Sequence, residues 1–391
     1  MKRAEFIALS ASMMILTALG IDIMLPAFGD VRRAFHLSPD STETSLIIAS
    51  FFLGQVAQIG FGTVSDSWGR LAILRIGFPL YIAGGLAGAL APDLPTIYLA
   101  RFVQGMGAAA IFMITVASVR DRFAGDEMAR TMSLVLTVFL FTPIVAPFLG
   151  AGLLAVSSWR IVFLVPPIFA VGVFLWSLRL EESLPPERRR PLDLAGVMRA
   201  VRDVLGQATF LRYVAITTVV FSVFSSYLAS SERIVGEIYG RPELFPWIFA
   251  GTGALQSVST FANARLVRRF GARRTLRALL LIYSAVAGAL TLAILWRGDP
   301  PGIAIFFAGI VTLVALVPTI EPNSSALALE PLGALAGTSA AIYGTTFFFV
   351  GSLAGTFVSR LLVASVAPLA IGHAIAGAVA LALAFTDRRR P

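Results

Sequence analysis

Cysteine is absent from this sequence, and histidine occurs only twice, as His36 and His373. Without cysteine the chain forms no disulfide and offers no thiolate to a metal, and two histidines alone do not make a structural zinc site. Charged residues are also scarce, at 14% of the chain, whereas a soluble protein averages about 25%. These absences exclude a soluble globular protein, and we expect no metal site and no redox cofactor.

Apolar residues are abundant instead, because 57% of the 391 residues are hydrophobic and the mean hydropathy is +0.83. They gather in stretches of about 20, the length with which a helix crosses about 30 Å of hydrocarbon. Lipid cannot satisfy free backbone groups and barrel strands are about half as long, so the stretches predict an all-α membrane protein. The twelve predicted spans are 6–28, 43–63, 72–91, 95–117, 131–155, 160–179, 210–231, 244–264, 275–296, 302–320, 338–360 and 366–385.

The first span is too long for the core of a signal peptide and no small-residue cleavage pattern follows it, so we expect it to be retained. The net charge of +9 does not indicate nucleic acid, because the basic residues mark membrane topology. With both termini in the cytoplasm, Arg101 lies deep within the membrane and seven of the 31 basic residues are assigned to outer loops. The seven are Arg32, Arg33, Arg160, Arg233, Arg241, Arg297 and Arg360. The inner segments then hold the rest, including the runs Arg188–Arg190, Arg265–Arg277 and Arg388–Arg390. We expect a multi-pass protein of a bacterial cytoplasmic (inner) membrane.

The longest polar stretch separates six spans from six. It predicts a bundle over 1–179, a cytoplasmic linker over 180–209 and a second bundle over 210–391. Within the linker, Pro185 and Pro186 are expected to end the sixth helix. Residues 194–205 are expected to form an amphipathic surface helix.

A weak internal repeat supports two related halves. "TVSDSWGRLAILR" after the second span has a counterpart in "LVRRFGARRTLR" after the eighth, with Gly69 and Gly271 at matching places. Each lies on the inner side between the second and third spans of its half, as repeated transporter halves require.

One acid, Asp22, stands within the first apolar stretch. A carboxylate at the centre of a membrane helix costs about 2.5 to 3.5 kcal/mol, so such residues usually mark ion or substrate paths. At 1.5 Å per residue, Asp22 lies about 22 Å and Arg101, on the fourth span, about 21 Å from the inner face. Opposite charges at matching depth can pair or share a hydrogen-bonded network. We interpret them as a proton-coupling pair; the alternative is that they only lock two helices together.

The stretch "GTVSDSWGR", from Gly62 to Arg70, is predicted to be a short inner loop. Gly69 would make its tight turn, and Asp66 would cap the next helix or pair with Arg70 or Arg75. The stretch is equally compatible with a turn that merely carries charges.

Two prolines one turn apart, Pro143 and Pro147, predict a kink in the fifth span. The small residues around them, within "FTPIVAPFLGAG", permit close helix packing.

These stretches, taken in order, resemble the major facilitator superfamily and, within it, the twelve-span drug:proton antiporters of the Bcr/CflA type, which include chloramphenicol and florfenicol exporters. "DIMLPA" is similar to their first-helix acid followed by Leu-Pro-Ala. "GTVSDSWGRL" resembles the superfamily loop motif, although Ser67 and Leu71 replace residues that are usually basic. "RFVQGMGAA" resembles the fourth-helix motif built on Arg101, Gln104 and Gly105.

The resemblance extends through the fifth helix and into the second half of the chain. "TPIVAPFLGA" resembles the fifth-helix antiporter motif through Pro143, Ala146, Pro147 and Gly150. "VRDRF", "SWRIVF", "EESLP", "YLASSE" and "AGTSAAIYG" extend the match over nearly the whole chain.

The resemblance implies a major facilitator fold, in which two pseudo-symmetric six-helix bundles rock about a central cavity. Asp22 would be the protonation site and Arg101 its partner, the loop with Asp66 would secure the outward-open arrangement, and the fifth helix would act as hinge and leak barrier. Three further ionisable residues each have two interpretations. Glu232 is interpreted as an outer-loop charge or a residue of the cavity mouth, and Glu321 as an interfacial or a coupling residue. His373 is interpreted as a packed histidine rather than a proton carrier.

The cavity candidates are mostly neutral. Residues one and two turns from Asp22 on its helix face carry no second acid, which favours neutral or modestly polar lipophilic substrates. Aromatic residues of the seventh and eleventh spans offer adaptable apolar walls, or else pack internally or face lipid. The candidates are Met14, Ile15, Ala18, Gln104, Phe221, Phe224, Tyr227, Asn323 and Phe348.

We therefore expect a monomeric transporter, not an enzyme, that exports small lipophilic drugs of multidrug or phenicol type in exchange for protons and uses no cofactor. The alternative with the same fold exports a metabolite, siderophore or sugar. An intramembrane enzyme is a distant alternative, because neither a protease constellation nor the paired acidic motifs of a prenyl transferase occur. A non-transporting receptor is equally distant.

Overall fold

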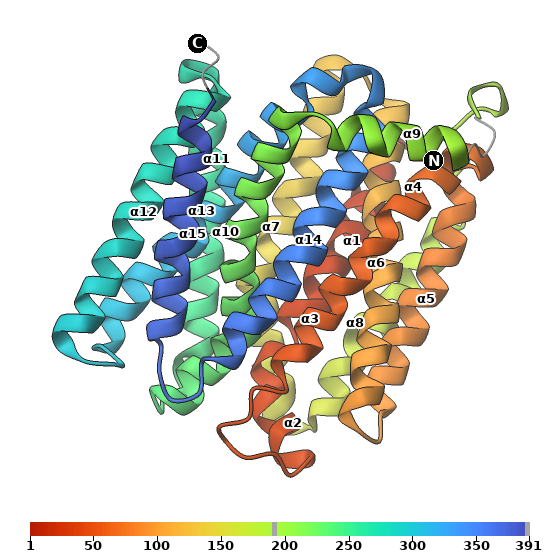
Figure 1. Ribbon diagram of the computed structural model, residues 1–391. Helices are drawn as coiled ribbons and strands as arrows, with labels where there is room; N and C mark the ends of the chain where they lie inside the picture. The colour runs from red at the N-terminus through yellow and green to blue at the C-terminus, as the bar shows by residue number, and fades with distance from the viewer. Residues whose placement is uncertain (190–193, 388–391) are drawn as a thin grey trace. The chain divides into compact units, whose positions relative to one another are not determined.

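The computed structural model describes residues 1–189 and 194–387, and nearly all of them are helical (Figure 1). Arg190 and Arg388–Arg390 of the predicted basic runs, and 190–193 of the predicted linker, lie outside this description. The first half contains α1 (Arg3–Asp22), η1 (Leu25–Ala27), α2 (Phe28–Ala34), α3 (Ser45–Gly54), η2 (Gln55–Ala57), α4 (Gln58–Trp68), α5 (Arg70–Leu90), α6 (Leu94–Arg122), α7 (Gly125–Val156), α8 (Trp159–Ser177) and η3 (Pro186–Arg188). The second contains α9 (Leu194–Leu205), α10 (Ala208–Arg233), η4 (Ile234–Ile238), η5 (Pro242–Leu244), α11 (Phe245–Phe270), α12 (Ala272–Arg297), α13 (Ile303–Leu329), η6 (Glu330–Leu335), α14 (Ala336–Arg360) and α15 (Ala367–Phe385).

A long helix lies at each of the twelve predicted spans, which confirms the all-α membrane fold. Two of the spans are interrupted, α1 by η1 before α2 and α3 by η2 before α4. Among the described residues, eleven helices are long and apolar enough to cross a membrane. The remaining one, α11, has 26 residues and falls short in apolarity because it carries polar side chains, several of them buried. Its buried polar residues are Thr252, Gln256 and Asn263.

The chain divides into two compact units. The first comprises Met1–Phe35 and Ser50–Val197, and the second comprises His36–Ala49 and Met198–Pro391. The boundary at 197 falls inside the predicted linker. The stretch 36–49 belongs to the second unit, where the Arg233 guanidinium donates to the Pro39 carbonyl at 3.4 Å.

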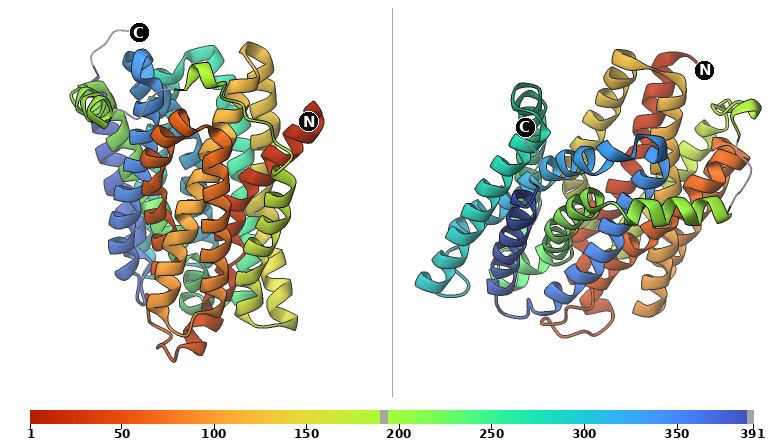
Figure 2. Two further views of the ribbon diagram at one scale, coloured as in Figure 1. Left: turned by 90° about the vertical axis from the view of Figure 1, so that its right-hand side faces the viewer. Right: turned by 45° about the horizontal axis from the view of Figure 1, so that its top comes forward.

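Within each unit the same pairs of helices pack together. In the first unit α1 packs on α6, α7 and α8, and α5 packs on α6 and α8. In the second unit α10 packs on α13, α14 and α15, and α12 packs on α13 and α15. Figures 1 and 2 show the helices of each unit side by side. Counting spans from the start of each unit, the two sets of pairs correspond one to one, as repeated halves predict.

The repeat is also visible in the backbone at two glycines. Gly69, between α4 and α5, has φ of 99° and ψ of 162°, and Gly271, between α11 and α12, has φ of 79° and ψ of 157°. This backbone region is essentially restricted to glycine. The sequence repeat around Gly69 and Gly271 therefore encodes the same turn in both units.

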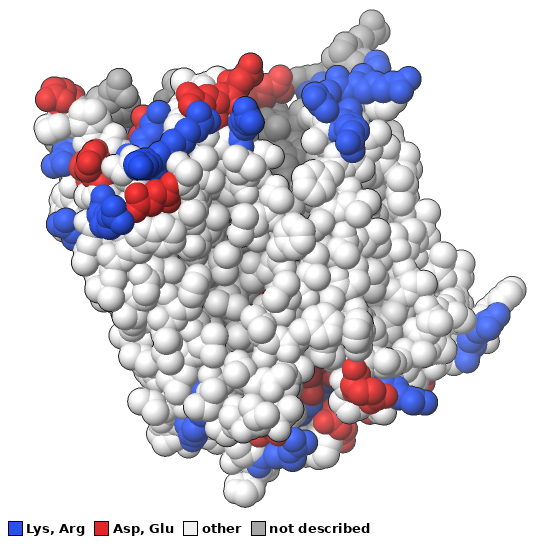
Figure 3. Space-filling model, turned by 180° about the vertical axis from the view of Figure 1, so that it is seen from behind, with Lys and Arg blue, Asp and Glu red and all other residues white. Residues whose placement is uncertain are grey.

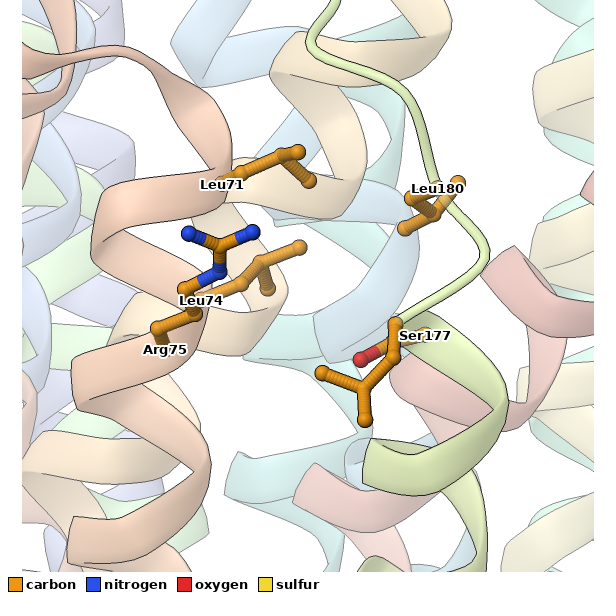
Figure 4. Close-up of a pocket in the computed structure, with 6 residues that line it drawn as sticks. Leu71, Leu74, Arg75, Ser177 and Leu180 are labelled. Carbon is orange, nitrogen blue, oxygen red and sulfur yellow. The ribbon is translucent and has the colours of Figure 1, made fainter.

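The end of α8 differs from the prediction. The helix ends at Ser177, before Pro185 and Pro186, so the prolines do not end it. The chain leaves the helix where the following segment is bound to the start of α5 through Glu182. A small cavity lined by Leu71, Leu74, Arg75, Ser177, Leu178 and Leu180 lies between the start of α5 and the end of α8 (Figure 4). The predicted surface helix is present as α9.

Candidate functional site

The break in α1 follows directly from its sequence. Asp22 is the last residue of α1 and is only 5% exposed. Pro26, four residues later, has no N–H to donate to the Asp22 carbonyl, so the α-helical hydrogen-bond ladder stops. The chain tightens instead, with the Met24 N–H donating to the Ile21 carbonyl at 3.2 Å and the Ala27 N–H to that of Met24 at 2.9 Å. The acid thus stands where a membrane helix is interrupted.

Arg101 of α6 binds this interrupted end. In a regular helix the Met24 N–H would donate to the Gly20 carbonyl, but here it donates to Ile21. The Arg101 guanidinium donates to the Gly20 carbonyl at 2.6 Å and to the Gln104 side-chain oxygen at 2.5 Å. It also lies over the Phe51 ring, 4.5 Å from the centroid. Because Arg101 is fully buried, these contacts and the carbonyl end of the helix dipole compensate its lost hydration.

The structure therefore brings Arg101 to the turn of α1 that ends at Asp22. It does not form the direct ion pair that matching depth had suggested, because the guanidinium binds a backbone carbonyl two residues earlier. No described residue makes a hydrogen bond or an ion pair within 4.0 Å with the Asp22 side chain. A proton can consequently bind to or leave the carboxyl group without breaking a salt bridge.

Two more helices contact this end of α1. The Tyr81 hydroxyl of α5 donates to the Leu16 carbonyl at 2.6 Å. On α7, Gly150 faces the Ile23 carbonyl so closely that an added Cβ would collide with it, and that Cβ would lie 3.3 Å from Pro26. The predicted fifth-span motif therefore contacts the backbone beside Asp22. Pro143 and Pro147 lie within the same helix, α7, which continues from Gly125 to Val156.

Sequence reasoning missed Phe51 and Tyr81. Both stand in apolar runs, "SFFLG" and "FPLYIAGG", where aromatic residues are common and have many roles. Tyr81 carries the only usable signal, since a hydroxyl within a span needs a hydrogen-bond acceptor.

The cavity candidates of the first unit are largely buried. Met14 and Ala18 are 1% and 7% exposed, Gln104 is fully buried, and Ile15 is half-buried. Gln104 is bound to Arg101, so it is one of the contacts that orient the guanidinium.

The aromatic candidates of the second unit contact one another. The Phe221 ring of α10 lies 5.7 Å from that of Phe224, and 5.2 Å from those of Phe347 and Phe348 of α14. Tyr227, on α10 as well, is 1% exposed. These rings therefore contact one another within the unit, and the half-buried Phe224 and Phe348 keep part of their surface exposed.

Several polar side chains of α13 are also buried. Asn323 donates to the Asn263 side chain of α11 at 2.8 Å and to the Thr319 carbonyl at 2.7 Å. The predicted end of this span at residue 320 was wrong: α13 continues to Leu329, because buried polar residues can satisfy one another inside the unit. Glu321 is therefore an internal residue of a helix rather than a residue at its end.

The structure also shows where two other ionisable residues lie. Glu232, which was interpreted as an outer-loop charge or a residue of the cavity mouth, lies in the last turn of α10, which ends at Arg233, and is half-buried. His373 on α15 is fully buried and its Nδ1 is hydrogen-bonded to the Tyr283 hydroxyl at 2.6 Å, as expected for a packed histidine.

The predicted loop from Gly62 to Arg70 is mostly helical. Gly62 and Asp66 lie on α4, which extends to Trp68, so that Gly69 alone makes the turn. The polar stretch remains helical because its side chains bond within the turn. Arg70 donates to the Asp66 carboxylate at 2.6 Å, and the Ser65 hydroxyl donates to the Gly62 carbonyl at 2.8 Å.

Arg70 has further partners that the sequence did not reveal. It binds Asp121, at the end of α6, at 2.9 Å. Glu182, after α8, accepts hydrogen bonds from the backbone N–H groups of Arg70 at 3.0 Å and Leu71 at 3.1 Å. Glu182, not Asp66, therefore satisfies the start of α5, and the "EESLP" stretch that contains it was the available signal.

Among the residues that the structure describes, no group of three or more His, Asp or Glu side chains forms a possible metal site. Asp22 at the end of α1 and Arg101 of α6 are two ionisable side chains that meet at the same turn of a membrane helix.

Comparison with known proteins identifies relatives over nearly the full length. Residues 10–356 match the Major Facilitator Superfamily. The chain is 28% identical to the bicyclomycin resistance protein homolog of Haemophilus influenzae, over 93% of this chain and 91% of that protein. It is also 28% identical to the uncharacterized MFS-type transporter YdgK of Bacillus subtilis, over 88% and 86% respectively. It is 27% identical to the multidrug resistance protein MdtL of Shigella dysenteriae, over 87% and 85%.

Solved structures share the fold at low identity. A D-xylose-proton symporter has a TM-score of 0.75 at 16% identity, covering 99% of this chain and 98% of that one. A mutant of the nucleoside transporter NupG has a TM-score of 0.71 at 12% identity, covering 97% and 98%. At these identities the likeness concerns the fold alone.

Proposed function

Because the chain belongs to the Major Facilitator Superfamily, we propose that it is a proton-coupled transporter that exports small lipophilic drugs. Family membership makes it a membrane transporter of small molecules rather than an enzyme. Export of drugs is supported by the names of two relatives, a bicyclomycin resistance protein homolog and a multidrug resistance protein. The neutral residues inward of Asp22 favour neutral or modestly polar compounds, such as phenicols.

The observation that carries the proposal is the geometry at the end of α1. Asp22 is buried at the break, has no described partner, and is flanked by a backbone that Arg101 of α6, Tyr81 of α5 and Gly150 of α7 hold in place. A movement of these helices changes the surroundings of the carboxyl group, and with them its affinity for a proton. Such a group binds a proton in one state and releases it in another.

Coupling then follows from competition between two ligands. A protonated Asp22 and a bound drug favour opposite conformations, so the inward proton gradient drives drug outward. The proton is the only coupling ion in this scheme and no cofactor takes part. We further propose that the transporter works as a monomer in the bacterial inner membrane. Both termini are placed in the cytoplasm, because this orientation leaves few arginines outside.

The test replaces the carboxyl group with its neutral isostere. Everted membrane vesicles that contain Asp22→Asn are given an imposed pH gradient and screened with phenicols, quinolones, organic cations and simple metabolites. We expect uphill drug transport to be abolished while the protein still reaches the membrane. The matched control is Asp126→Asn, an exposed acid on the first turn of α7, which should transport as the wild type does. Undiminished uphill export by Asp22→Asn would refute the coupling role, and wild-type transport of a metabolite instead of any drug would refute the substrate class.

A further inference from the structure

The turn between α11 and α12 presents a patch of exposed arginines. Arg265, Arg268 and Arg269 at the end of α11 and Arg274 at the start of α12 are all exposed. Figure 3 shows blue side chains gathered at this end of the second unit, at the upper right, with no red atoms among them. We call these four residues the arginine patch.

The arginine patch has no acidic partner among the described residues. None of its four guanidinium groups makes an ion pair within 4.0 Å with a described carboxylate. The neighbouring Arg273 and Arg277 are different. Arg273 pairs with Asp387 at 3.1 Å, and Arg277 donates to the Asp387 carbonyl at 2.9 Å. Contacts with Asp387 thus hold Arg273 and Arg277, whereas the four guanidinium groups of the arginine patch are exposed.

The arginine patch stands at the end of apolar exposed surface. On α11, exposed Leu255, Val258 and Phe261 recur at helical spacing and lead to Arg265. Arg265 follows Phe261 by one turn, a rise of about 6 Å. On α12, the exposed Ala278 and Leu281 follow Arg274 at the same spacing. Apolar side chains that face hydrocarbon and end in arginines match the boundary between the acyl chains and the headgroups of a bilayer.

The side chains between the arginines suit the same boundary. Leu266 is 40% exposed and Phe270 is 46% exposed, and the Arg269 guanidinium lies 5.2 Å from the centroid of the Phe270 ring. A guanidinium binds phosphate oxygens in a bidentate manner, while an exposed aromatic ring beside it inserts among lipid chains.

The corresponding turn of the first unit lacks this character. Its arginine, Arg70, is bound by Asp66 and Asp121, and Glu182 covers the backbone after Gly69. The two turns have the same backbone conformation but differ in how their charges are paired, so the unpaired charge at Gly271 is not a requirement of the fold.

We propose that the arginine patch binds the headgroups of anionic phospholipids in the inner leaflet of the membrane. Each headgroup would place its phosphate against one or two guanidinium groups and its acyl chains along the exposed apolar residues of α11 or α12. The proposal concerns the second unit alone and does not depend on which compound the protein transports.

The test measures lipid binding by the purified full chain in detergent. Native mass spectrometry counts bound phosphatidylglycerol and phosphatidylcholine for the wild type and for a variant with Arg265→Gln, Arg268→Gln, Arg269→Gln and Arg274→Gln. Since each arginine near an anionic surface contributes appreciably, we expect the variant to bind phosphatidylglycerol at least about tenfold more weakly. Binding of phosphatidylcholine should be equal for the two proteins.

A control variant removes the same number of charges from arginines that have acidic partners. It carries Arg3→Gln, Arg33→Gln, Arg179→Gln and Arg241→Gln, and these exposed residues pair with Glu127, Asp30, Glu5 and Glu243. We expect it to bind phosphatidylglycerol as the wild type does. Equal losses in the two variants would reduce the effect to net charge and overturn the proposal, as would undiminished binding by the patch variant.

Two measurements separate the remaining outcomes. A fourfold Arg→Lys variant of the patch keeps the charge but loses the bidentate guanidinium contacts, so it should bind phosphatidylglycerol more weakly than the wild type and more tightly than the Arg→Gln variant. Its folding is checked by its elution profile, which should match that of the wild type. Adding free inorganic phosphate distinguishes a phosphate site from a lipid site. Displacement of the lipid by phosphate at equal concentration would overturn the proposal, because the exposed apolar residues are expected to favour the lipid.

Discussion

Arg101 stabilises the interrupted end of α1 rather than neutralising Asp22 directly. Its guanidinium satisfies the Gly20 carbonyl that the break leaves open and is oriented by Gln104 and the Phe51 ring. A flat group with several fixed donors suits these three contacts, whereas an ammonium ion is a compact point charge. Arg101 is therefore a positioning residue for the α1 turn as well as a charge near Asp22.

This geometry makes Arg101→Lys a specific test. Lysine keeps the positive charge but cannot bind both acceptors while stacking on Phe51, so one buried acceptor loses its partner. We expect the free energy of unfolding to fall by about 1 to 3 kcal/mol and proton-driven transport to fall at least about tenfold. Thermal unfolding in detergent and uptake by everted vesicles measure the two effects.

The chain offers a matched control in Arg160. Its guanidinium donates to the carbonyls of Ala89, at 2.7 Å, and Ala91, at 3.1 Å, near the end of α5, and it lies 4.5 Å from the centroid of the Trp159 ring. Arg160→Lys should lower stability to a similar degree and leave transport intact. If both variants transported equally well, the position of Arg101 beside Asp22 would have no functional meaning.

At the residue scale, the sequence identified Asp22 and Arg101 as candidates but did not show what they contact. Asp22 and Arg101 were identifiable because charges are rare in apolar stretches. Their arrangement was not, because Arg101 and Tyr81 bind backbone carbonyls of Gly20 and Leu16, and every residue has a carbonyl. The apolar and polar pattern of a sequence carries no information about such acceptors.

At the scale of elements, the contact between α1 and α7 connects the fifth-span motif to the turn that ends at Asp22. Gly150 of α7 meets the backbone of Ile23, the residue after Asp22. A side chain there would push the two helices apart where α1 is already interrupted. The small residue at this position thus determines how closely α7 approaches the turn.

Gly150→Ala therefore should destabilise the protein although alanine favours helix. The added methyl group would collide with the Ile23 carbonyl, and overpacking of this kind costs about 1 to 3 kcal/mol. Gly152→Ala is the control on the same helix, because an added Cβ there has no neighbour within 4 Å. We expect it to be neutral or to stabilise by up to about 1 kcal/mol. Thermal unfolding of the two variants decides, and equal stabilities would contradict the close approach.

Helix positions were predictable from hydropathy, but helix ends were not. The polar residues of α4 and α13 marked predicted ends, and the helices continue to Trp68 and Leu329. Asp66 pairs with Arg70 and Asn323 with Asn263, so these side chains are compatible with helix once partners exist. Hydropathy measures only the preference for lipid and ignores such pairs. The end of α8 at Ser177 lies close to the predicted end of that span at 179, but Pro185 and Pro186 do not cause it, because the helix stops before them.

On the scale of the whole molecule, the chain consists of two units with corresponding helix pairs and one shared turn. The turn is encoded by Gly69 in the first unit and Gly271 in the second. The side chains around the two glycines have diverged, from an acid-bound Arg70 in the first unit to the arginine patch in the second. What the halves retain in common is the backbone conformation, which depends on glycine.

Alanine at the two glycines separates backbone strain from packing. At Gly271 an added Cβ has no neighbour within 4 Å, so Gly271→Ala should cost only the strain of its φ of 79°, about 1 to 3 kcal/mol. At Gly69 the Cβ would also collide with the Glu182 carboxylate and lie 3.2 Å from Arg189, so Gly69→Ala should cost more. Gly288→Ala on α12 has open space and an ordinary helical φ, and should not destabilise. Thermal unfolding should show Gly288→Ala to be the most stable of the three variants, Gly271→Ala the next and Gly69→Ala the least stable. If Gly271→Ala were as stable as Gly288→Ala, the turn of the second unit would not need its glycine. The equivalence of the two units would then rest on helix packing alone.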